Sequence, residues 1–488
     1  MVEKFLVGGD WRAGNGDTFE TINPADGTVA GVVAHATEQD VDDAVRAAAL
    51  AVAAPAWRDM PAHKRARLLH RFAELIDTNR DMLVELQTRD NGKTIAEGYL
   101  HVQGATDKFR YCAAVCETLE SAVIPPRGDY FCFDTYEPVG VVAAMTAFNS
   151  PILHEAGKIA PALAAGNAVV LKSSEVTPLI GLQYGRLALE AGIPPGIVNV
   201  VTGGPSVGNA LVRNPAVNMI AFTGGTHTGR IIGKAAAELI VPCILELGGK
   251  SPNIVFEDAN LDDAVIGMIY GIFSNAGQSC IAGSRILVQA SIYDSFVARL
   301  VAATKALKVG SPHDPTTAVA PVASFRQRDT IEGFIRAGID EGARVLAGGT
   351  RPTGGIYDKG AYVTPTLLEV ERRDSRIARE EVFGPVGCVM KFEDEADLYE
   401  LANGTVFGLS LGIWTNDYRK ALRAARNIKA GTVWVNTHKI GQPSVPMGGF
   451  KQSGIGRENG IDGIREYLQI KSTYLNLSRS PIPWPPKG

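Results

Sequence analysis

The sequence predicts an α/β protein whose main domain is a doubly wound parallel sheet, and three observations support this. From Val139 onward, short apolar runs alternate with helical segments, a pattern typical of βαβ units. A glycine-rich turn lies between one such run and the next helical segment, which is typical of a phosphate-binding loop. The chain has 488 residues, too many for one ordinary hydrophobic core, so two or three domains are expected.

The composition is that of a globular protein without electrostatic affinity for polyanions. Hydrophobic residues make up 45% and charged residues 20% of the chain, and the formal net charge is -4. This balance gives no case for nucleic acid or an anionic membrane as a partner. No signal peptide is evident, and the most apolar region, Val139 to Leu171, contains charged residues that prevent it from spanning a bilayer.

The six cysteines are too few in so long a chain to form a disulfide framework, so we expect a cytoplasmic protein. Cys112 and Cys116 could share a helix face, but no second Cys or His pair lies at ligand spacing. We therefore expect plain burial of these thiols and no metal.

Residues 38–118 are expected to be helical. Asp40 and its acidic neighbours open an alanine-rich helix, where negative charge stabilises the N-terminal end of the helix dipole. Arg65 to Asp77 and Arg80 to Asp90 have apolar residues at three- and four-residue intervals, which indicates two further amphipathic helices.

Four apolar runs are the candidate strands of the parallel sheet: Val139–Ala144, Ala168–Leu171, Ile197–Val201 and Met219–Phe222. In such sheets, ligands bind at the carboxyl ends of the strands.

A second α/β stretch begins near Lys250 and runs past Val435. Tyr130 to Tyr136 alternates like an exposed ribbon strand, and we expect it to pair with Ile470 to Leu477, within or between subunits.

A cysteine and a glutamate each lie at a glycine-lined chain reversal. Cys280 ends the segment Asn-Ala-Gly-Gln-Ser-Cys and precedes a predicted strand, Ile281 to Gln289. Glu246 lies at the end of another apolar run and is followed by Leu-Gly-Gly-Lys-Ser-Pro. An accessible thiol and a carboxylate base are the groups required for covalent thioester chemistry in which water releases the product.

Together with further segments, these two motifs resemble the NAD(P)-dependent aldehyde dehydrogenase superfamily over nearly the whole chain. The further segments are Phe-Thr-Gly-Gly-Thr-His-Thr-Gly at 222–229, Glu-Val-Phe-Gly-Pro at 381–385 and Pro-Met-Gly-Gly-Phe-Lys-Gln-Ser-Gly-Ile-Gly-Arg-Glu at 446–458. The resemblance implies a Rossmann-type cofactor domain, an α/β catalytic domain and a small β-ribbon oligomerisation arm, in a homodimer or homotetramer. The implied boundaries are 1–120 and 140–247 for the NAD-binding domain, 248–445 for the catalytic domain, and 121–139 with 468–488 for the arm, while 446–467 returns to the NAD-binding domain.

The resemblance also implies a cofactor, which we expect to be NAD. Gly225 replaces the family's usual serine, Ser173 replaces a proline, and Phe148 stands where tryptophan is usual. The carboxylate of Glu175 can accept both ribose hydroxyls but would repel a 2′-phosphate, which favours NAD over NADP. The residues implied to bind the cofactor are Thr146, Ala147, Phe148, Lys172, Ser174, Glu175, Gly204, Gly208, Phe222, Thr223, Gly224, Gly225, Thr228, Leu247, Gly248, Glu381 and Phe383.

Three residues are implied to be catalytic. In the family, Cys280 would attack the aldehyde, Glu246 would activate water, and Asn149 with the Cys280 backbone N–H would hold the oxyanion. Glu458 would support the water path. On local sequence alone, Asn149 would instead cap the helix after Pro151. The expected reaction is the NAD-dependent oxidation of an aldehyde to a carboxylic acid through a cysteine thiohemiacetal and thioester.

Three alternatives remain open. Relatives that pass the acyl group to coenzyme A generally lack the base at the Glu246 position, so its presence favours water. Gly-Pro-Ser-Val-Gly at 204–208 matches the nucleophile elbow of an α/β-hydrolase esterase, in which Ser206 would act with a downstream histidine such as His438. A catalytically silent scaffold would keep the fold only.

The predicted substrate pocket has small side chains where relatives that act on small aldehydes have bulky aromatics. This predicts a roomy channel for a bulky or aromatic aldehyde. His438 and Lys439 could attract an anionic substrate, although exposed basic residues usually serve only solubility. The residues proposed to line the pocket are Ser150, His154, Gly157, Ser274, Ser279, Ile281 and Met447.

Overall fold

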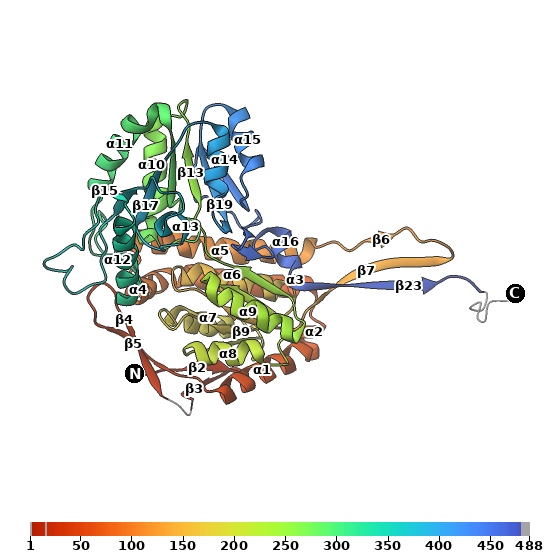
Figure 1. Cartoon of the computed structure of the whole chain (residues 1–488). Coiled ribbons are helices and arrows are strands. Elements are labelled where there is room, and N and C mark those ends of the chain that lie inside the picture. Colours follow the sequence, from red (N-terminus) through yellow and green to blue (C-terminus); the bar gives the residue numbers. More distant parts are fainter. Residues whose placement is uncertain (1, 15–16, 480–488) are drawn as a thin grey trace.

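The computed structural model describes residues 2–14 and 17–479 and contains two large sheets (Figure 1). The proline-rich segment 481–486 and the last residues of the proposed arm lie outside the described residues. The α/β architecture expected from the sequence is confirmed, and its two large sheets have separate hydrophobic cores.

The first sheet has the strand order β22-β12-β11-β8-β9-β10-β2-β3. The four predicted strands form its parallel centre, in the order β11-β8-β9-β10. The strands of this sheet are β2 Phe5–Val7, β3 Asp10–Arg12, β8 Val141–Met145, β9 Ala168–Lys172, β10 Val198–Val201, β11 Met219–Thr223, β12 Cys243–Glu246 and β22 Gly454–Ile455.

One of these strands begins two residues later than predicted. Gly140 has a φ of +122°, which an L side chain rarely adopts, so the chain bends before β8. The amide oxygen of Asn218 accepts a hydrogen bond from the Val141 backbone N–H at 2.8 Å and fixes the first residue of the strand.

Helices pack against this sheet and beside it. The three predicted helical segments correspond to α1 (Glu38–Ala53), α3 (Ala62–Thr78) and α4 (Arg80–Asn91). Thr37 and Asp40 form a reciprocal capping box at the start of α1, which agrees with the acidic N-terminal turn. The other helices are α2 Pro55–Arg58, α5 Ile95–Thr118, α6 Pro151–Ala164, α7 Leu179–Glu190, α8 Pro205–Arg213, α9 Thr226–Leu239 and α16 Gly460–Arg465.

The second sheet has the order β15-β16-β17-β14-β13-β19-β20, with only β15 antiparallel to its neighbour. Its strands are β13 Pro252–Val255, β14 Arg285–Gln289, β15 Arg344–Ala347, β16 Thr366–Glu369, β17 Val386–Phe392, β19 Ser410–Trp414 and β20 Thr432–Val435. The helices that accompany it are α10 Leu261–Phe273, α11 Tyr293–Lys305, α12 Phe325–Asp340, α13 Arg376–Arg379, α14 Glu395–Asn403 and α15 Tyr418–Asn427.

The strand predicted from Ile281 begins only at Arg285. Between them, the backbone bonds within its own loop: Ala282 N–H donates to the Ser279 carbonyl, and Ser284 N–H donates to the Ala282 carbonyl. These local bonds replace a ladder with a neighbouring strand, so the chain after Cys280 is a turn.

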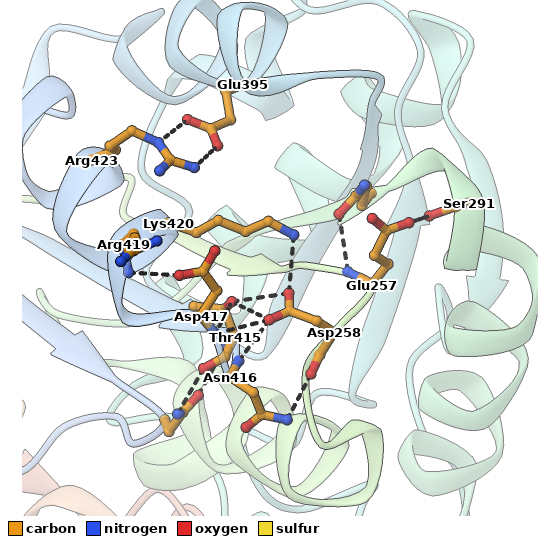
Figure 2. Close-up of polar contacts among 12 residues, drawn as sticks. Glu257, Asp258, Ser291, Glu395, Thr415, Asn416, Asp417, Arg419, Lys420 and Arg423 are labelled. Atoms are coloured by element: carbon orange, nitrogen blue, oxygen red, sulfur yellow. Dashed lines mark hydrogen bonds and ion pairs between the residues drawn. The ribbon is translucent and has the colours of Figure 1, made fainter.

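A polar cluster closes the carboxyl end of the second sheet (Figure 2). The Asp258 carboxylate, just after β13, accepts hydrogen bonds from Thr415 Oγ1 and from the backbone N–H groups of Asn416 and Asp417. Burial opposes ionisation of Asp258, but the bonds from Thr415 and Lys420 outweigh it and lower the carboxyl pKa. This end of the sheet is therefore fixed by its own side chains.

A three-stranded ribbon projects from the body (Figure 1, orange and blue). It consists of β6 (Val123–Ile124), β7 (Tyr130–Pro138) and β23 (Leu468–Asn476), in the order β23-β7-β6. The predicted pairing of the two ribbon segments is correct and occurs within one chain. Smaller sheets join β1 Val2–Glu3, β4 Thr18–Ile22 and β5 Val29–Ala34, and β18 Phe407–Gly408 with β21 Phe450–Lys451.

None of the helices within 2–14 and 17–479 combines the length and the apolar character that crossing a bilayer requires.

Candidate active site

A crevice of about 610 Å³ lies where the two sheets meet. It borders the carboxyl ends of β8, β9, β11 and β12 in the first sheet. Cys280 and Glu381 reach it from segments that precede β14 and β17, at the amino ends of second-sheet strands. The carboxyl end of one parallel sheet therefore faces the amino end of the other.

The crevice gathers nearly all of the side chains proposed for cofactor binding and all three proposed catalytic residues. Gly204 is the exception, because it lies at the N-cap of α8, one residue before the lining. Sequence reasoning missed seven lining residues: Met145, Pro205, Asn209, Val212, Ile231, Ile232 and Gln327.

Gln327 is the most informative of these omissions. It lies in the first turn of α12, far from any motif, and its amide donates to the carbonyls of Val382 and Phe383. It therefore holds the loop that carries Glu381. No local signal in the sequence indicates this role.

One end of the crevice has a lysine–carboxylate pair at the end of β9. Lys172 Nζ lies 3.2 Å from Glu175 Oε2. Burial lowers the pKa of Lys172, and Glu175 partly counteracts this. Ser173 turns inward, and its hydroxyl donates to Glu155 Oε1 at 2.6 Å. The serine that replaces proline at 173 thus gives one oxygen of this buried carboxyl group a hydrogen bond, while Glu155 Oε2 has no partner among the described residues.

The glycine-rich loop lies between β11 and α9. Gly225 is the N-cap of this 14-residue helix and makes no side-chain cap bond, so the first N–H groups of α9 have no capping side chain. A Cβ on Gly225 would meet open space, whereas a Cβ on Gly224 would overlap the Phe222 ring. Among the described residues, the hydroxyls of Thr223 and Thr226 are buried without a hydrogen-bond partner. Of these two threonines, Thr223 borders the crevice, where its hydroxyl can donate to an anionic ligand.

Cys280 follows a strained turn after α10. Asn275, Ala276 and Gly277 have φ values of +58°, +50° and +70°, and left-handed backbone is costly for the first two. Asn275 compensates with hydrogen bonds from its amide to the Gln278 carbonyl at 2.8 Å and to the Asn149 carbonyl at 3.3 Å. Burial raises the pKa of the Cys280 thiol to about 12, with a further contribution from the nearby Glu246.

Asn149 is directed at the same turn. Its Nδ2 donates to the Gln278 carbonyl at 3.0 Å, and its Oδ1 lies 3.0 Å from His154 Nε2. The N-cap of α6 is Ser150, so the alternative interpretation of Asn149 as the helix cap is wrong.

Glu246 is a buried carboxyl group at the end of β12, only 6% exposed. Among the described residues its Oε1 has no hydrogen-bond partner. Burial, followed by the charge of Glu458, raises the pKa of Glu246 well above its usual value. Glu458 forms an ion pair with the buried Lys158, and this lysine lowers the pKa of Glu458 against the effect of burial.

Glu381 and Phe383 form another wall. Glu381 Oε1 accepts a hydrogen bond from the Gly249 backbone N–H at 3.0 Å, and burial raises the pKa of Glu381 to about 7. The Phe383 ring meets Phe148 edge-on, with centroids 5.6 Å apart.

Only one of the seven residues proposed to line the substrate pocket borders the crevice. His154 borders the crevice, whereas Ser150, Gly157, Ser274, Ser279, Ile281 and Met447 do not. Gly157 does not leave empty volume, because a Cβ there would lie 3.3 Å from Lys108 Nζ. The lysine side chain occupies the space that the sequence assigned to a substrate.

Two residues expected to be exposed are not. His438 is buried, its Nε2 lies 3.2 Å from the Ile281 carbonyl oxygen, and its ring packs on Trp434. Lys439 is half-buried. Both follow β20 into the space beside the catalytic turn, and burial at this point comes from tertiary packing that local polarity does not reveal.

The hydrolase alternative receives no support. Ser206 lies exposed on the first turn of α8, beside a hollow lined by His35. His438, its proposed partner, contacts Ile281 in the other half of the molecule.

Comparisons with known proteins agree with this geometry. Residues 11–473 match the aldehyde dehydrogenase family. Human retinal dehydrogenase 2 is 42% identical over 479 residues, covering 97% of this chain and 92% of the relative. An NAD+ complex of aldehyde dehydrogenase from Bacillus cereus matches with a TM-score of 0.95 at 38% identity, over 98% of this chain and 97% of that one.

A structure of betaine aldehyde dehydrogenase from Staphylococcus aureus in complex with NAD+ matches with a TM-score of 0.97 at 38% identity, over 99% of this chain and 97% of that one. The chain therefore belongs to the aldehyde dehydrogenase family and is an NAD-dependent oxidoreductase that acts on aldehydes.

Proposed function

We propose that this enzyme oxidises a bulky or aromatic aldehyde to the carboxylic acid through a thiohemiacetal and a thioester on Cys280. The observation that carries the proposal is that Cys280, Glu246 and Asn149 border one crevice together with the glycine-rich loop of α9. A thiol, a high-pKa carboxyl group and an amide donor are the groups that this chemistry requires.

The residues of the crevice fit NAD. The unpartnered hydroxyl of Thr223 and the N–H groups at the start of α9, which have no capping side chain, suit a pyrophosphate. Glu175 beside Lys172 suits a ribose diol, and Glu381 with Phe383 suits the nicotinamide end. When bound, NAD supplies the acceptor for the hydride that leaves the substrate carbon.

Cys280 needs a base before it can attack. Its pKa of about 12 means that the thiol keeps its proton at neutral pH. Glu246 lies close enough to influence that pKa, because its negative charge opposes ionisation of the thiol. As the carbon–sulfur bond forms, the thiol proton would pass through water to the solvent, so Glu246 can still accept a proton in the hydrolysis step.

Asn149 would stabilise the oxyanion that develops on the substrate. Its amide has two N–H groups, of which one donates to the Gln278 carbonyl. The second N–H remains for the substrate oxygen, together with the Cys280 backbone N–H. One such donor contributes roughly 3–4 kcal/mol to the transition state.

Glu246 would next draw a proton from water, whose oxygen attacks the thioester and releases the acid and the thiol. The ion pair of Lys158 with Glu458 lies next to this carboxyl group. Lys158 opposes the rise of the Glu246 pKa and so favours its return to the ionised, basic form.

The proposed preference for a bulky or aromatic aldehyde rests on the sequence alone, in which small residues stand at Ser150 and Ser274; neither residue borders the crevice. Comparing kcat/KM for benzaldehyde and acetaldehyde tests it. We expect benzaldehyde to be preferred by at least ~10-fold, which corresponds to one or two favourable pocket contacts. A preference for acetaldehyde would contradict this part of the proposal.

We also propose a homo-oligomer, a dimer or a tetramer, in the cytoplasm. The projecting arm exposes large apolar side chains, among them Val123, Ile470, Tyr474 and Leu477, which favours their burial by another subunit. All six cysteines are free, which suits a reducing compartment.

The experiment that tests the mechanism is rapid mixing of enzyme, NAD and benzaldehyde with detection of NADH. Cys280→Ala should form no NADH. Glu246→Gln should give a burst of about one NADH per site, followed by slow turnover, because the thioester forms but is not hydrolysed. Cys116→Ala, a half-buried cysteine outside the crevice, is the matched control. Normal steady-state turnover by Cys280→Ala would refute the covalent mechanism.

A further inference from the structure

Two lysine ammonium groups flank the turn that carries Cys280, and neither forms an ion pair within the part of the chain that the structure describes. Lys439 Nζ donates to Ser274 Oγ at 2.9 Å, and Lys93 Nζ donates to Asn275 Oδ1. Both acceptors are neutral. A buried ammonium group normally has a carboxylate partner, so this arrangement calls for an explanation.

Lys439 is held at this place by its backbone. Its φ is +58°, in the left-handed region, and the preceding His438 is fixed against Ile281 and Trp434. The ammonium group lies 5.9 Å from the centroid of the Tyr270 ring. Ser274 donates its own proton to the Tyr270 carbonyl, so it offers Lys439 only a lone pair. Lys439 therefore has an unsatisfied charge.

Glu97 is the carboxylate whose charge influences the pKa of both lysines, but each of its oxygens already accepts a hydrogen bond from another residue. One accepts the Asn275 backbone N–H at 2.5 Å, and the other accepts the Thr94 hydroxyl at 2.9 Å. Its charge still reaches both lysines, because it raises the pKa of each against the larger effect of burial. One carboxylate thus lies near two lysines, so the net charge of these three groups is positive when both lysines are protonated.

The neighbouring histidines add no negative charge and little positive charge. Burial lowers the pKa of His154 to about 4 and that of His101 well below its usual value, so both rings are neutral at physiological pH. Burial also lowers the pKa of Lys439 to about 7, with a further contribution from Lys93. An anion that arrived beside Lys439 would restore its full charge.

This positive region adjoins the turn that carries the nucleophile Cys280. Ser274 and Asn275, which the two lysines contact, belong to the turn that ends at Cys280. Cys280 lies close enough to Lys439 for a negative charge on its sulfur to raise the pKa of this lysine. Neither lysine borders the cofactor crevice, so NAD does not account for them.

We propose that Lys439, with Lys93 behind Asn275, selects aldehydes that carry a carboxylate at the end remote from the carbonyl group. The inference rests on the proposed oxidation at Cys280 and narrows its substrate class to semialdehydes, including formyl-substituted aromatic acids. The product of such a substrate is a dicarboxylate.

Two pairs of substrates test the inference: 4-formylbenzoate with its methyl ester, and 5-oxopentanoate with its methyl ester. Within a pair, the size and the reactivity of the carbonyl are similar, and only the charge differs. For at least one pair, we expect kcat/KM for the acid to exceed that for the ester by about 10- to 100-fold, which is the usual contribution of a charge-assisted hydrogen bond. The difference should lie mainly in KM.

Lys439→Met removes the charge and keeps the length of the side chain, and the ratio of acid to ester should fall towards one. Lys305→Met, which removes an exposed lysine on α11, is the matched control and should keep the wild-type ratio. Lys439→Glu should reverse the selectivity, so that 4-(trimethylammonio)benzaldehyde is preferred over 4-formylbenzoate. A misfolded variant cannot produce such a reversal.

A wild-type ratio near one for both pairs, or a high ratio that persists in Lys439→Met, would overturn the inference while leaving aldehyde oxidation intact. If none of the four aldehydes yields NADH with the wild-type enzyme, the proposed function itself fails, and the inference fails with it.

Discussion

Glu381 should limit the stability of the free enzyme above neutral pH, and replacing it with glutamine should relieve this. Burial raises the pKa of Glu381 from 4.5 to about 7. At about 1.36 kcal/mol per pKa unit, this rise corresponds to roughly 3 kcal/mol. Because the side chain is half-buried and borders the crevice, water screens part of the cost, so roughly 3 kcal/mol is an upper bound.

The sign follows from proton binding. Between about pH 4.5 and pH 7 the unfolded chain ionises this carboxyl group while the folded protein keeps it protonated, so the free energy of unfolding falls as the pH rises. Glu381→Gln removes that dependence. The stability gain of the variant should therefore be small near pH 4.5 and complete above about pH 7.

Thermal unfolding of the free enzyme at several pH values measures this gain. With about 2.1 cal/mol/K per residue over 488 residues, the unfolding entropy is about 1 kcal/mol/K, so the gain corresponds to at most about 3 °C. Glu371→Gln, an exposed carboxyl group in the preceding segment, is the matched control and should show no such change. A difference in Tm that is the same at about pH 5 and about pH 8.5 would refute the reasoning.

Other predictions concern the cofactor and the arm. Glu175→Ala should raise kcat/KM for NADP relative to NAD, because the carboxylate that would repel a 2′-phosphate is gone; an unchanged ratio would assign selectivity elsewhere. Gly225→Ser should fit in the open space at that position and lower the Kd for NAD about 2- to 10-fold through one added hydrogen bond. Gly224→Ala should weaken NAD binding, because its Cβ would overlap the Phe222 ring. Calorimetric titration with NAD compares the two variants. Ile470→Asp combined with Tyr474→Asp should lower the particle mass in light scattering, since both side chains are exposed on the arm, and an unchanged mass would place the subunit contact elsewhere.

The parts of the fold that follow from local patterns could be predicted from the sequence. The four central strands are continuous apolar runs bounded by turns, and all four form the parallel centre of the first sheet. Arg65 to Asp77 has helical periodicity and lies inside α3. The glycine loop at 224–225 and Glu246 lie at strand ends, where topology brings ligand-binding groups together.

Features that depend on distant segments could not be predicted. Gln327 reaches the crevice from α12, and its role is recognisable only from its hydrogen bonds to the loop before β17. The sequence suggests that Gly157 leaves space for a substrate, but in the structure Lys108 of the preceding helix, α5, lies beside it. Lys439 is polar in sequence but half-buried in the structure, because the turn after β20 folds it against Ser274.

The pairing of β7 with β23 has a consequence for biosynthesis. Lys471 and Glu137, which meet across the two strands, are 334 residues apart in the chain. At ribosomal rates of about 5–20 residues per second, roughly 20–70 s pass between the emergence of the first strand and that of its partner. During that time the unpaired edge of β7, with Tyr130 and Phe131 exposed, is a site for adhesion between nascent chains. The interval in which this protein most needs a chaperone is therefore set by the time taken to translate its second sheet.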